Sequence, residues 1–174
     1  MGMTDNEILK TFSRNPNQGM RELIETFTPY LYGIIRPMLH SHQDTDEVLQ
    51  RTFINAWKGL AHFRGDAALK TWLHRIAIRT AWSFIKAEKN RTMNANDLLL
   101  VSAGEDAQLE NPQLLLLRAL SELPPKQRLI FVLRYFENMP LDRIANLIQR
   151  SQGNIKAQYH HARSKLEKYF SLLH

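Results

Sequence analysis

The sequence predicts an all-α protein: two small helical domains joined by a flexible acidic linker, with a helix-turn-helix in the C-terminal domain. Apolar residues recur at helical steps of three and four along most of the 174-residue chain. Basic residues stop after Arg91 for about twenty residues, a length typical of a domain boundary. Near the C-terminus, a tight turn precedes Ser151, which is placed to cap a final helix. We therefore expect domains at 1–91 and 112–174, with 92–111 as the linker.

The first domain opens with two helical segments. Thr4, with Glu7 three residues later, has the spacing of a capping box at the start of a short helix, and Pro16 interrupts that helix. The apolar pattern then continues, although Pro29 removes a backbone hydrogen-bond donor. We expect either two helices, the second capped by Thr28, or one kinked helix.

The next helix is expected from Asp44 to Leu60, with Asp44 and Glu47 as its N-cap pair. Its apolar positions predict a buried face formed by Leu49, Phe53, Ala56, Trp57 and Leu60. The outer face is a mixed polar surface without obvious chemistry, formed by Asp46, Glu47, Gln50, Arg51 and Asn55.

Two different faces run along the helix that follows the loop HFRGDAA. Steps of three and four bring together one apolar face, formed by Leu69, Leu73, Ile76, Thr80 and Phe84. The same steps give the opposite side a basic and aromatic stripe, formed by Arg75, Arg79, Trp82 and Lys86. Because cations neutralise phosphates and exposed rings stack on unpaired bases, this stripe suits a nucleic-acid strand. The helix alone leaves open a solvated basic face with a half-buried Trp82.

The second domain is predicted to consist of short helices that end in a helix-turn-helix. A leucine-rich helix over 114–123 is stopped by Pro124, and two short periodic helices follow it. Their apolar positions are Leu129, Val132, Leu133 and Phe136 in the first, and Leu141, Ile144, Ala145 and Ile148 in the second. After the turn Gln149-Arg150, a third helix begins at its cap Ser151. Its inward face is expected to hold Ile155, Tyr159, Ala162, Leu166 and Phe170.

The early exposed positions of this third helix fit a reader of duplex DNA. They are Gln152, Gly153, Asn154, Lys156, Ala157 and His160, followed by Arg163. A recognition helix enters the major groove with its N-terminal turns, where Asn and Gln pair with adenine and Lys pairs with guanine. Other cations are better placed for phosphates, which position the helix without reading sequence: Arg143, Arg150, Lys165 and Lys168. A trihelical core used for protein binding is the alternative.

Composition excludes several classes of function. The chain has no cysteine, so it forms neither disulfides nor thiolate metal sites. The pairs His40/His42 and His160/His161 lack the spacing and the carboxylates of a metal site, and the chain has neither a phosphate-binding glycine loop nor a nucleophile elbow. We expect no catalytic residue, no metal and no cofactor. Because no long apolar run or signal-peptide layout is present, we expect a soluble intracellular protein.

Charge is distributed unevenly along the chain, whose formal net charge is +6. Residues 1–91 carry 13 Lys and Arg against 9 Asp and Glu, and residues 112–174 carry 10 against 4. Residues 92–111 carry 4 acidic residues and no basic one. Two basic blocks around an acidic segment favour two contacts with a polyanion. Two ordinary basic domains on a tether are the alternative.

Two sets of motifs lie on either side of the linker. The first set is DTDEVLQRTFINAW followed by FRGDAALKTWLHRIAIR. The second is LSELPPKQRLIFVLRYFENMPLDRIANLI followed by SQGNIKAQYHHARSKL. In this order they make the chain resemble the extracytoplasmic-function (ECF) sigma factors, a group of the bacterial sigma-70 family, over about its whole length. The two sets together are more specific than a helix-turn-helix alone.

The resemblance implies a non-enzymatic subunit that directs core RNA polymerase to promoters and assists strand opening, with sigma region 2 in the first domain and region 4 in the second. The residues it implies for binding core polymerase are Asp46, Glu47, Gln50, Arg51, Phe53 and Trp57. Those for the promoter −10 element are Phe63, Arg64, Lys70, Trp72, Arg75, Arg79, Trp82 and Lys86, with a flipped base held at residues 62–69. Those for the −35 element are Arg150, Ser151, Gln152, Gly153, Asn154, Lys156, Ala157, His160 and Arg163.

The resemblance also implies partners and a location. The partners are core RNA polymerase, through its beta-prime clamp and beta subunits, promoter DNA, and an anti-sigma factor. The acidic linker would run through the polymerase near the RNA exit path, and catalysis would belong to the polymerase. The expected location is the bacterial cytoplasm, with tethering at the inner membrane only through an anti-sigma factor and no direct membrane insertion.

Four residues, at three places in the chain, depart from the family pattern. Arg51 occupies a place where the family usually has an acidic residue, Arg79 replaces a common Asn, and Gln149-Arg150 replaces a Gly-apolar turn. Two other functions remain open at this point. One is a stand-alone helix-turn-helix regulator whose N-terminal half dimerises or senses a signal. The other is an interaction module that binds polymerase or an anti-sigma protein without initiating transcription.

Overall fold

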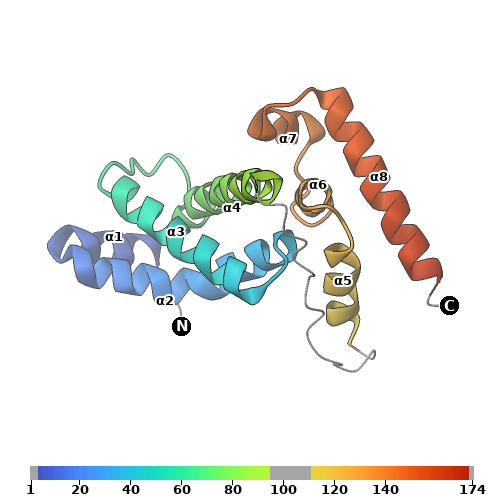
Figure 1. The fold of residues 1–174 in the computed structure, drawn as a ribbon. Helices are drawn as coiled ribbons and strands as arrows, with labels where there is room; N and C mark the ends of the chain where they lie inside the picture. The colour runs from blue at the N-terminus through green and yellow to red at the C-terminus, as the bar shows by residue number, and fades with distance from the viewer. Residues whose placement is uncertain (1–3, 95–110, 173–174) are drawn as a thin grey trace. The chain divides into compact units, whose positions relative to one another are not determined.

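A computed structural model describes residues 4–94 and 111–172, and over these residues the protein is helical without any strand. The helices follow one another along the chain as Figure 1 shows. They are α1 (Asp5–Arg14), α2 (Pro16–Ile35), the 3₁₀ turn η1 (Arg36–Met38), α3 (His42–Leu60), α4 (Leu69–Asn94), α5 (Pro112–Ser121), α6 (Pro125–Tyr135), α7 (Leu141–Ile148) and α8 (Gln152–Ser171). The all-α prediction is confirmed. Over the described ranges, no helix combines the length and the apolar composition needed to cross a membrane.

Contacts between Cα atoms divide the chain into two compact units. The first comprises Met1–Arg36 with Ser41–Ala81, and the second comprises Pro37–His40 with Trp82–His174. The boundary therefore falls within α4. Each unit has its own set of buried apolar side chains. The predicted linker at 92–111, with its expected flexibility, lies almost wholly outside the described residues.

The start of α1 confirms the predicted capping box. Thr4 Oγ1 accepts a hydrogen bond from the Glu7 backbone N–H at 3.4 Å, and the Glu7 carboxylate accepts one from the Thr4 backbone N–H at 2.7 Å. The backbone bond from Thr4, followed by its side-chain bond, stabilises the ionised carboxylate and holds the pKa of Glu7 below its ordinary value. These reciprocal bonds fix the first turn of α1.

Close packing joins α1 to α2. Ile8 is fully buried, and a Cβ at Gly19 would lie 2.4 Å from the N and Cα atoms of Phe12. Asn15 lies between the helices and caps α2, where its Oδ1 accepts from the Gln18 N–H at 3.2 Å. The backbones of the two helices therefore approach at a point where only glycine fits.

The helix α2 is continuous through Pro29, so the single-helix alternative is confirmed and Thr28 caps no helix. A proline inside a helix removes one hydrogen bond and crowds the preceding turn. Burial of the apolar stripe on α2 offsets this loss. Its buried apolar residues are Met20, Leu23, Phe27, Leu31, Ile34 and Ile35.

The helix α3 begins at His42, earlier than predicted. Ser41 is its N-cap, and its Oγ accepts from the Asp44 N–H at 3.0 Å. The predicted Asp44–Glu47 cap is therefore wrong, and Asp44 instead lies in the first turn, where its charge complements the helix dipole. Trp57, predicted on the inner face, is 40% exposed. The buried residues of α3 are Thr45, Val48, Leu49, Thr52, Phe53, Ala56 and Leu60.

In the second unit, a buried arginine closes the end of α5. Arg128 of α6 is 1% exposed, and its Nε donates to the Leu120 carbonyl at 2.6 Å. Its Nη2 donates to the Ser121 carbonyl at 2.7 Å and to the Leu123 carbonyl at 3.2 Å. Carbonyls at a helix C-terminus lack the usual amide partner four residues on, so the guanidinium supplies a donor to the Ser121 carbonyl and a second donor to the Leu120 carbonyl, which also accepts from the Leu123 N–H at 3.1 Å.

The helices α6, α7 and α8 form the predicted helix-turn-helix core, with α8 packed along α6 and α7 (Figure 1). Phe136, predicted to face inward, is 39% exposed: it is the C-cap of α6, where its ring lies at the edge of the core against the rings of Phe131 and Tyr135. Gln149 ends α7 with a φ of 56°, in the left-handed region that usually takes glycine. The core residues of these helices include Leu129, Val132, Leu133, Ile144, Ala145, Ile148, Ile155, Ala162 and Leu166.

Candidate nucleic-acid interfaces

The loop between α3 and α4, residues 61–68, is anchored at its start by backbone hydrogen bonds. The His62 N–H donates to the Gly59 carbonyl at 3.0 Å, and the Phe63 N–H donates to the Leu60 carbonyl at 3.1 Å. Gly65 has a φ of 77°, a conformation that other residues rarely adopt. The loop therefore leaves α3 in a defined turn and reverses at a glycine.

Trp72 in the first turns of α4 supports this loop. Its ring centroid lies 5.2 Å from that of Phe63, and a Cβ at Gly59 would lie 3.0 Å from its Cζ2. Phe63 and Trp72 are half-buried, whereas Arg64 is exposed. Of these three predicted −10 residues, Arg64 is the one that is fully accessible, and Trp72 mainly holds the loop in place.

Both faces predicted for α4 are present. Leu69, Leu73, Thr80 and Phe84 are buried and Ile76 is half-buried. On the other side, Arg75, Arg79 and Lys86 are exposed and Trp82 is half-buried. Arg75 and Arg79 form no ion pair with any residue of the described ranges, so their guanidinium groups are available to phosphates. We call these four residues, Arg75, Arg79, Trp82 and Lys86, the α4 stripe.

Lys70 lies away from the α4 stripe. Its Nζ is 4.1 Å from the ring centroid of Tyr30 on α2, and the Tyr30 hydroxyl is hydrogen-bonded to His74 Nδ1 at 3.0 Å. Residues four apart share a helix face, so Lys70 and His74 both face α2. The structure therefore does not bring Lys70 together with the other predicted −10 residues.

The outer face of α3 carries most of the residues predicted to bind core polymerase. Asp46, Gln50, Arg51 and Trp57 are exposed. Glu47 is half-buried and forms an ion pair with Arg51 one turn along the helix. Phe53 is 7% exposed, so its side chain belongs to the core and its assignment as a contact residue is corrected.

An apolar part of this α3 face was missed by the sequence reasoning. Ile54 is 48% exposed, next to Trp57 on the same helix face. The Trp57 ring meets Phe12 of α1 edge-on, with centroids 5.8 Å apart. The sequence did contain a sign of this exposed patch: Ile54 is apolar but does not fit the helical spacing of the buried face, so it could have been expected at the surface.

Exposed residues dominate the N-terminal turns of α8. Ser151 Oγ accepts from the Asn154 N–H at 3.3 Å, which confirms the predicted cap. Ile155 and Ala162 are fully buried on the opposite face. All the predicted −35 residues are exposed: Arg150, Ser151, Gln152, Gly153, Asn154, Lys156, Ala157, His160 and Arg163.

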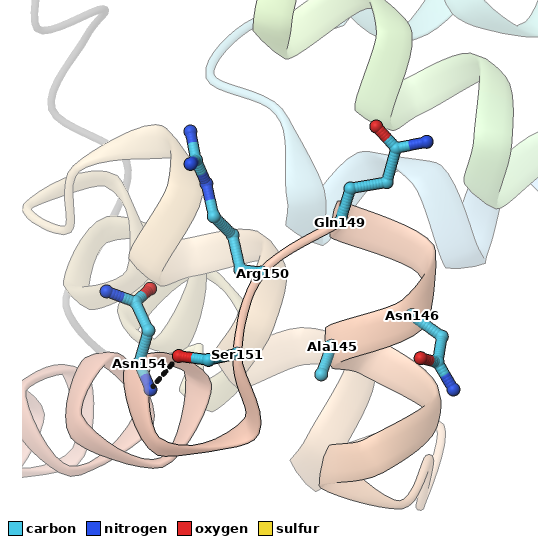
Figure 2. Close-up of a pocket in the computed structure, with 6 residues that line it drawn as sticks. All are labelled: Ala145, Asn146, Gln149, Arg150, Ser151 and Asn154. Carbon is cyan, nitrogen blue, oxygen red and sulfur yellow. Dashed lines mark hydrogen bonds between the residues drawn. The ribbon is translucent and has the colours of Figure 1, made fainter.

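A shallow polar pocket of about 570 Å³ lies at the turn between α7 and α8. Its lining residues are Ala145, Asn146, Gln149, Arg150, Ser151 and Asn154. In Figure 2, Ser151 Oγ points at the Asn154 backbone nitrogen, while the side chains of Gln149 and Arg150 extend outward. Three predicted −35 residues thus share one concave surface with Gln149 of the predicted turn and with Asn146, which the motif pattern did not single out.

Contacts from α6 add to the polar surface of α8. The Lys126 Nζ lies 3.5 Å from the Asn154 Oδ1, and the Gln127 side chain donates to Gln158 Oε1 at 3.1 Å. Lys126 therefore brings a further cation to the start of α8. Local patterns in the chain could not predict this contact, because the two residues are 28 positions apart.

Arg163 forms an ion pair with Glu167, one turn along α8. Its Nε donates to Glu167 Oε1 at 2.7 Å, and this hydrogen bond raises the pKa of Arg163 above its ordinary value. Both side chains are exposed. Within residues 4–94 and 111–172, no three His, Cys, Asp or Glu side chains lie close enough together to hold a metal ion.

Two family models match the chain. The model described as Sigma-70 region 2 matches residues 23–91, which include α3, the α3–α4 loop and the α4 stripe. The model described as Sigma-70, region 4 matches residues 113–166, which include α6, α7 and the exposed turns of α8. The two matches have the same order as the two motif sets in the sequence.

Relatives align with nearly the whole chain. It is 28% identical to the RNA polymerase sigma-H factor of Pseudomonas aeruginosa, over 94% of this chain and 92% of that protein. It is 25% identical to the ECF RNA polymerase sigma-E factor of Escherichia coli (strain K12), over 95% of this chain and 93% of that protein. The similarity therefore spans both candidate interfaces.

Solved structures share the fold. One is the sigma factor RpoE from Bartonella quintana in complex with the anti-sigma factor NepR, with a TM-score of 0.62 and 19% identity over 87% of this chain and 96% of that one. Another is CnrH in complex with the cytosolic domain of CnrY, with a TM-score of 0.54 and 19% identity over 97% of each chain. At this level of identity, the likeness is one of fold.

Proposed function

The chain belongs to the sigma-70 family and to its ECF class, and from this premise we propose that it directs core RNA polymerase to a set of promoters and assists their opening. The observation that carries the proposal is the presence of region 2 and region 4 in one chain, each with an exposed basic helix face. We assign region 2 to residues 1–91, the linker to 92–111 and region 4 to 112–174. The RNA-forming chemistry would belong to the polymerase.

Strand opening is assigned to the α3–α4 loop and the α4 stripe. The loop, with exposed Arg64 and half-buried Phe63, would take up an unpaired −10 base, and the stripe would hold the adjoining strand. A ligand shifts an equilibrium only as far as it binds one state better than the other. Trp82 can stack on unpaired bases but not on bases paired within a duplex, so the stripe would bind the melted promoter better, with the arginines holding its phosphates.

The −35 element is assigned to α8. Its capped N-terminus presents Gln152, Asn154 and Lys156 without a covering side chain from the same helix, as a recognition helix in the major groove requires. Arg150 in the turn and Lys126 on α6 both lie near the helix start, where they could contact phosphates. Phosphate contacts would position the domain and base contacts would select the sequence.

Core polymerase is assigned to the outer face of α3. The face combines exposed acids and amides, Asp46 and Gln50, with the apolar pair Ile54 and Trp57, a mixture typical of transient protein interfaces. Arg51, at a position where the family is usually acidic, already pairs with Glu47 in the free protein. Core polymerase would therefore encounter a Glu47–Arg51 ion pair, where the usual family pattern would present two acidic side chains.

We also propose an anti-sigma factor as a partner. This rests on the two structures of similar fold, one of RpoE in complex with the anti-sigma factor NepR and the other of CnrH in complex with the cytosolic domain of CnrY. A partner of this kind would hold the protein in the bacterial cytoplasm, or at the inner membrane if it were itself membrane-bound.

In vitro transcription with purified core polymerase on a genomic promoter library tests the proposal. We expect specific promoters to be transcribed only when both proteins are present. Stand-alone binding to an operator at nanomolar affinity, indifferent to core polymerase, would favour the helix-turn-helix regulator instead.

The triple variant Arg75→Ala, Arg79→Ala, Trp82→Ala tests the α4 stripe. Loss of one stacking ring and two phosphate contacts should lower open-complex formation by roughly a hundredfold and leave core binding intact. A variant that changes Lys10 and Arg21, exposed cations outside the predicted sites, to Ala is the matched control. Normal melting with lost core binding would show that the stripe faces the polymerase.

A further inference from the structure

The helix α4 takes its N-terminal cap from α1. Leu69 is the first residue of α4, and its backbone N–H donates to Asp5 Oδ2 at 2.8 Å. The preceding residue, Ala68, has no side-chain oxygen with which to cap the helix, although its carbonyl accepts from the Trp72 N–H at 3.1 Å as an N-cap carbonyl does. The cap is thus supplied by a carboxylate 64 positions earlier in the chain.

The capped end of α4 lies in a sheltered place. Leu69 is fully buried and Asp5 is half-buried, so water competes weakly for the Leu69 N–H. A negative charge at a helix N-terminus is also favoured by the helix dipole. Both effects make the Asp5 carboxylate the natural partner of this amide.

The helix α1 is fixed well enough to serve as a cap for another helix. The reciprocal bonds between Thr4 and Glu7 order its first turn, which contains Asp5. Ile8 one turn later is fully buried, and Gly19 allows the closest approach of α2. The Asp5 carboxylate is therefore held from a helix that is anchored on both sides of it.

The α3–α4 loop is consequently held at three places. Its start is anchored by the turn bonds from His62 and Phe63 to α3, and its middle by the contact between Phe63 and Trp72. Its far end, at Leu69, is anchored by Asp5. Only this third anchor comes from a helix outside α3 and α4.

We propose that Asp5 is a positioning residue for promoter opening. By capping α4, it fixes the far end of the α3–α4 loop and the direction in which the α4 stripe continues from it. Asp5 itself contacts no DNA and acts through Leu69. The inference rests on the proposed function of the loop and the stripe in reading the −10 strand.

Asp5→Ala and Asp5→Asn variants test the proposal, with Glu25→Ala as a control that removes an exposed acid of α2 outside the predicted sites. Open-complex formation is followed with core polymerase and a promoter carrying 2-aminopurine in the −10 element. We expect Asp5→Ala to reduce opening about fivefold, in line with the loss of one helix cap, without changing core binding. Asp5→Asn should recover part of the loss, because its amide oxygen still accepts from Leu69. Glu25→Ala should open promoters as the wild type does.

Amide hydrogen exchange in the free protein supplies a readout that does not depend on transcription. We expect faster exchange of the Leu69 N–H in Asp5→Ala, with the buried amides of α2 unchanged. Normal opening by Asp5→Ala would overturn the proposal, and so would an equal loss of opening and core binding, which indicates a general loss of stability. Asp5→Asn as impaired as Asp5→Ala would also contradict it. If the wild type directed core polymerase to no promoter, the proposed function itself would fail, and the wild-type reaction would reveal this before any variant is compared.

Discussion

The two helices assigned to promoter DNA, α4 and α8, share a basic exposed side and a buried apolar side but begin in different ways. In α8, Ser151 caps the helix from the adjacent position, and the exposed candidate contacts follow at once. In α4, Ala68 offers no cap, and Asp5 of α1 supplies one from 64 positions away. The start of α8 is therefore stabilised by a residue next to it in the sequence, whereas the start of α4 is stabilised by a residue of another helix.

This difference matches the shapes of the two forms of DNA. A duplex presents a regular major groove, and a single capped helix end is sufficient to enter it. An unpaired strand has no fixed shape, so its reader needs a preformed loop and a stacking surface. We infer that damage to the packing of α1 impairs strand reading alone, and that damage to the core formed by α6, α7 and α8 impairs duplex reading alone.

The largest effect is expected from Arg128→Met in the second unit. Methionine keeps an apolar side chain but removes the guanidinium donor from the carbonyls of Ser121 and Leu123, whereas the Leu120 carbonyl keeps its bond from the Leu123 N–H. We expect the free energy of unfolding of this unit to fall by about 3 kcal/mol, because buried acceptors lose their partners. Differential scanning calorimetry would follow the transition. The control is Arg134→Met, an exposed arginine on the same helix, and an equal loss in both would contradict the role of Arg128.

A smaller effect, of about 2 kcal/mol, is expected from Gly19→Ala in the first unit. The new Cβ would lie 2.4 Å from the Phe12 backbone, so α1 must move away from α2. The cost of overpacking exceeds the better helix propensity of alanine. Chemical denaturation measures the change, and −35 duplex binding should remain. Gly33→Ala in the same helix meets nothing within 4 Å and should be neutral or stabilising.

Base selection by α8 is tested by Lys156→Ala. Lys156 is exposed in the N-terminal turns of α8, so its loss should relax the preference at one −35 position by about 1–3 kcal/mol. Transcription from a library randomised in the −35 element, with core polymerase, measures the preference. Lys165→Ala, which removes a cation farther along α8, should weaken all promoters equally. An unchanged preference in Lys156→Ala would move the base readout to other residues.

The smallest effect is expected from Gln149→Gly at the turn before α8. Gln149 has a φ of 56°, which costs a side-chain-bearing residue about 1 kcal/mol relative to glycine. The greater freedom of glycine in the unfolded chain offsets part of this gain, so we expect a stabilisation of about 0.5 kcal/mol. Thermal unfolding of the second unit measures it. Gln149→Ala, which keeps the strain, should leave stability nearly unchanged, and a similar gain in both variants would exclude backbone strain as the cause.

Much of the fold could be predicted from local patterns. The capping box at Thr4 and the cap at Ser151 depend on residues three positions apart, and both are confirmed. The opposite faces of α4 follow from helical spacing, and both are present. The start of α3 was misjudged because Ser41 and Asp44 both have side chains suited to capping, and only the structure shows that Ser41 does so.

Other features depended on packing between helices. Pro29 was compatible with a break or with a continuous helix. The structure has one helix, whose apolar side chains are buried on both sides of Pro29. Phe53 and Trp57 occupy the same expected face of α3, yet Phe53 is 7% exposed and Trp57 is 40% exposed, because the helices packed against α3 cover the first ring and leave part of the second accessible.

By itself, the sequence determined the all-helical class, most of the apolar faces, the order of the two motif sets and the caps of α1 and α8, because these depend on hydrogen bonds and side-chain periodicity within a few positions. The tertiary structure alone decided which helix ends meet. The contact of Lys126 with Asn154 and the cap that Asp5 gives to Leu69 join residues 28 and 64 positions apart. Such pairs leave no periodic trace in the chain, since their geometry arises only when separate helices bury their apolar faces against each other.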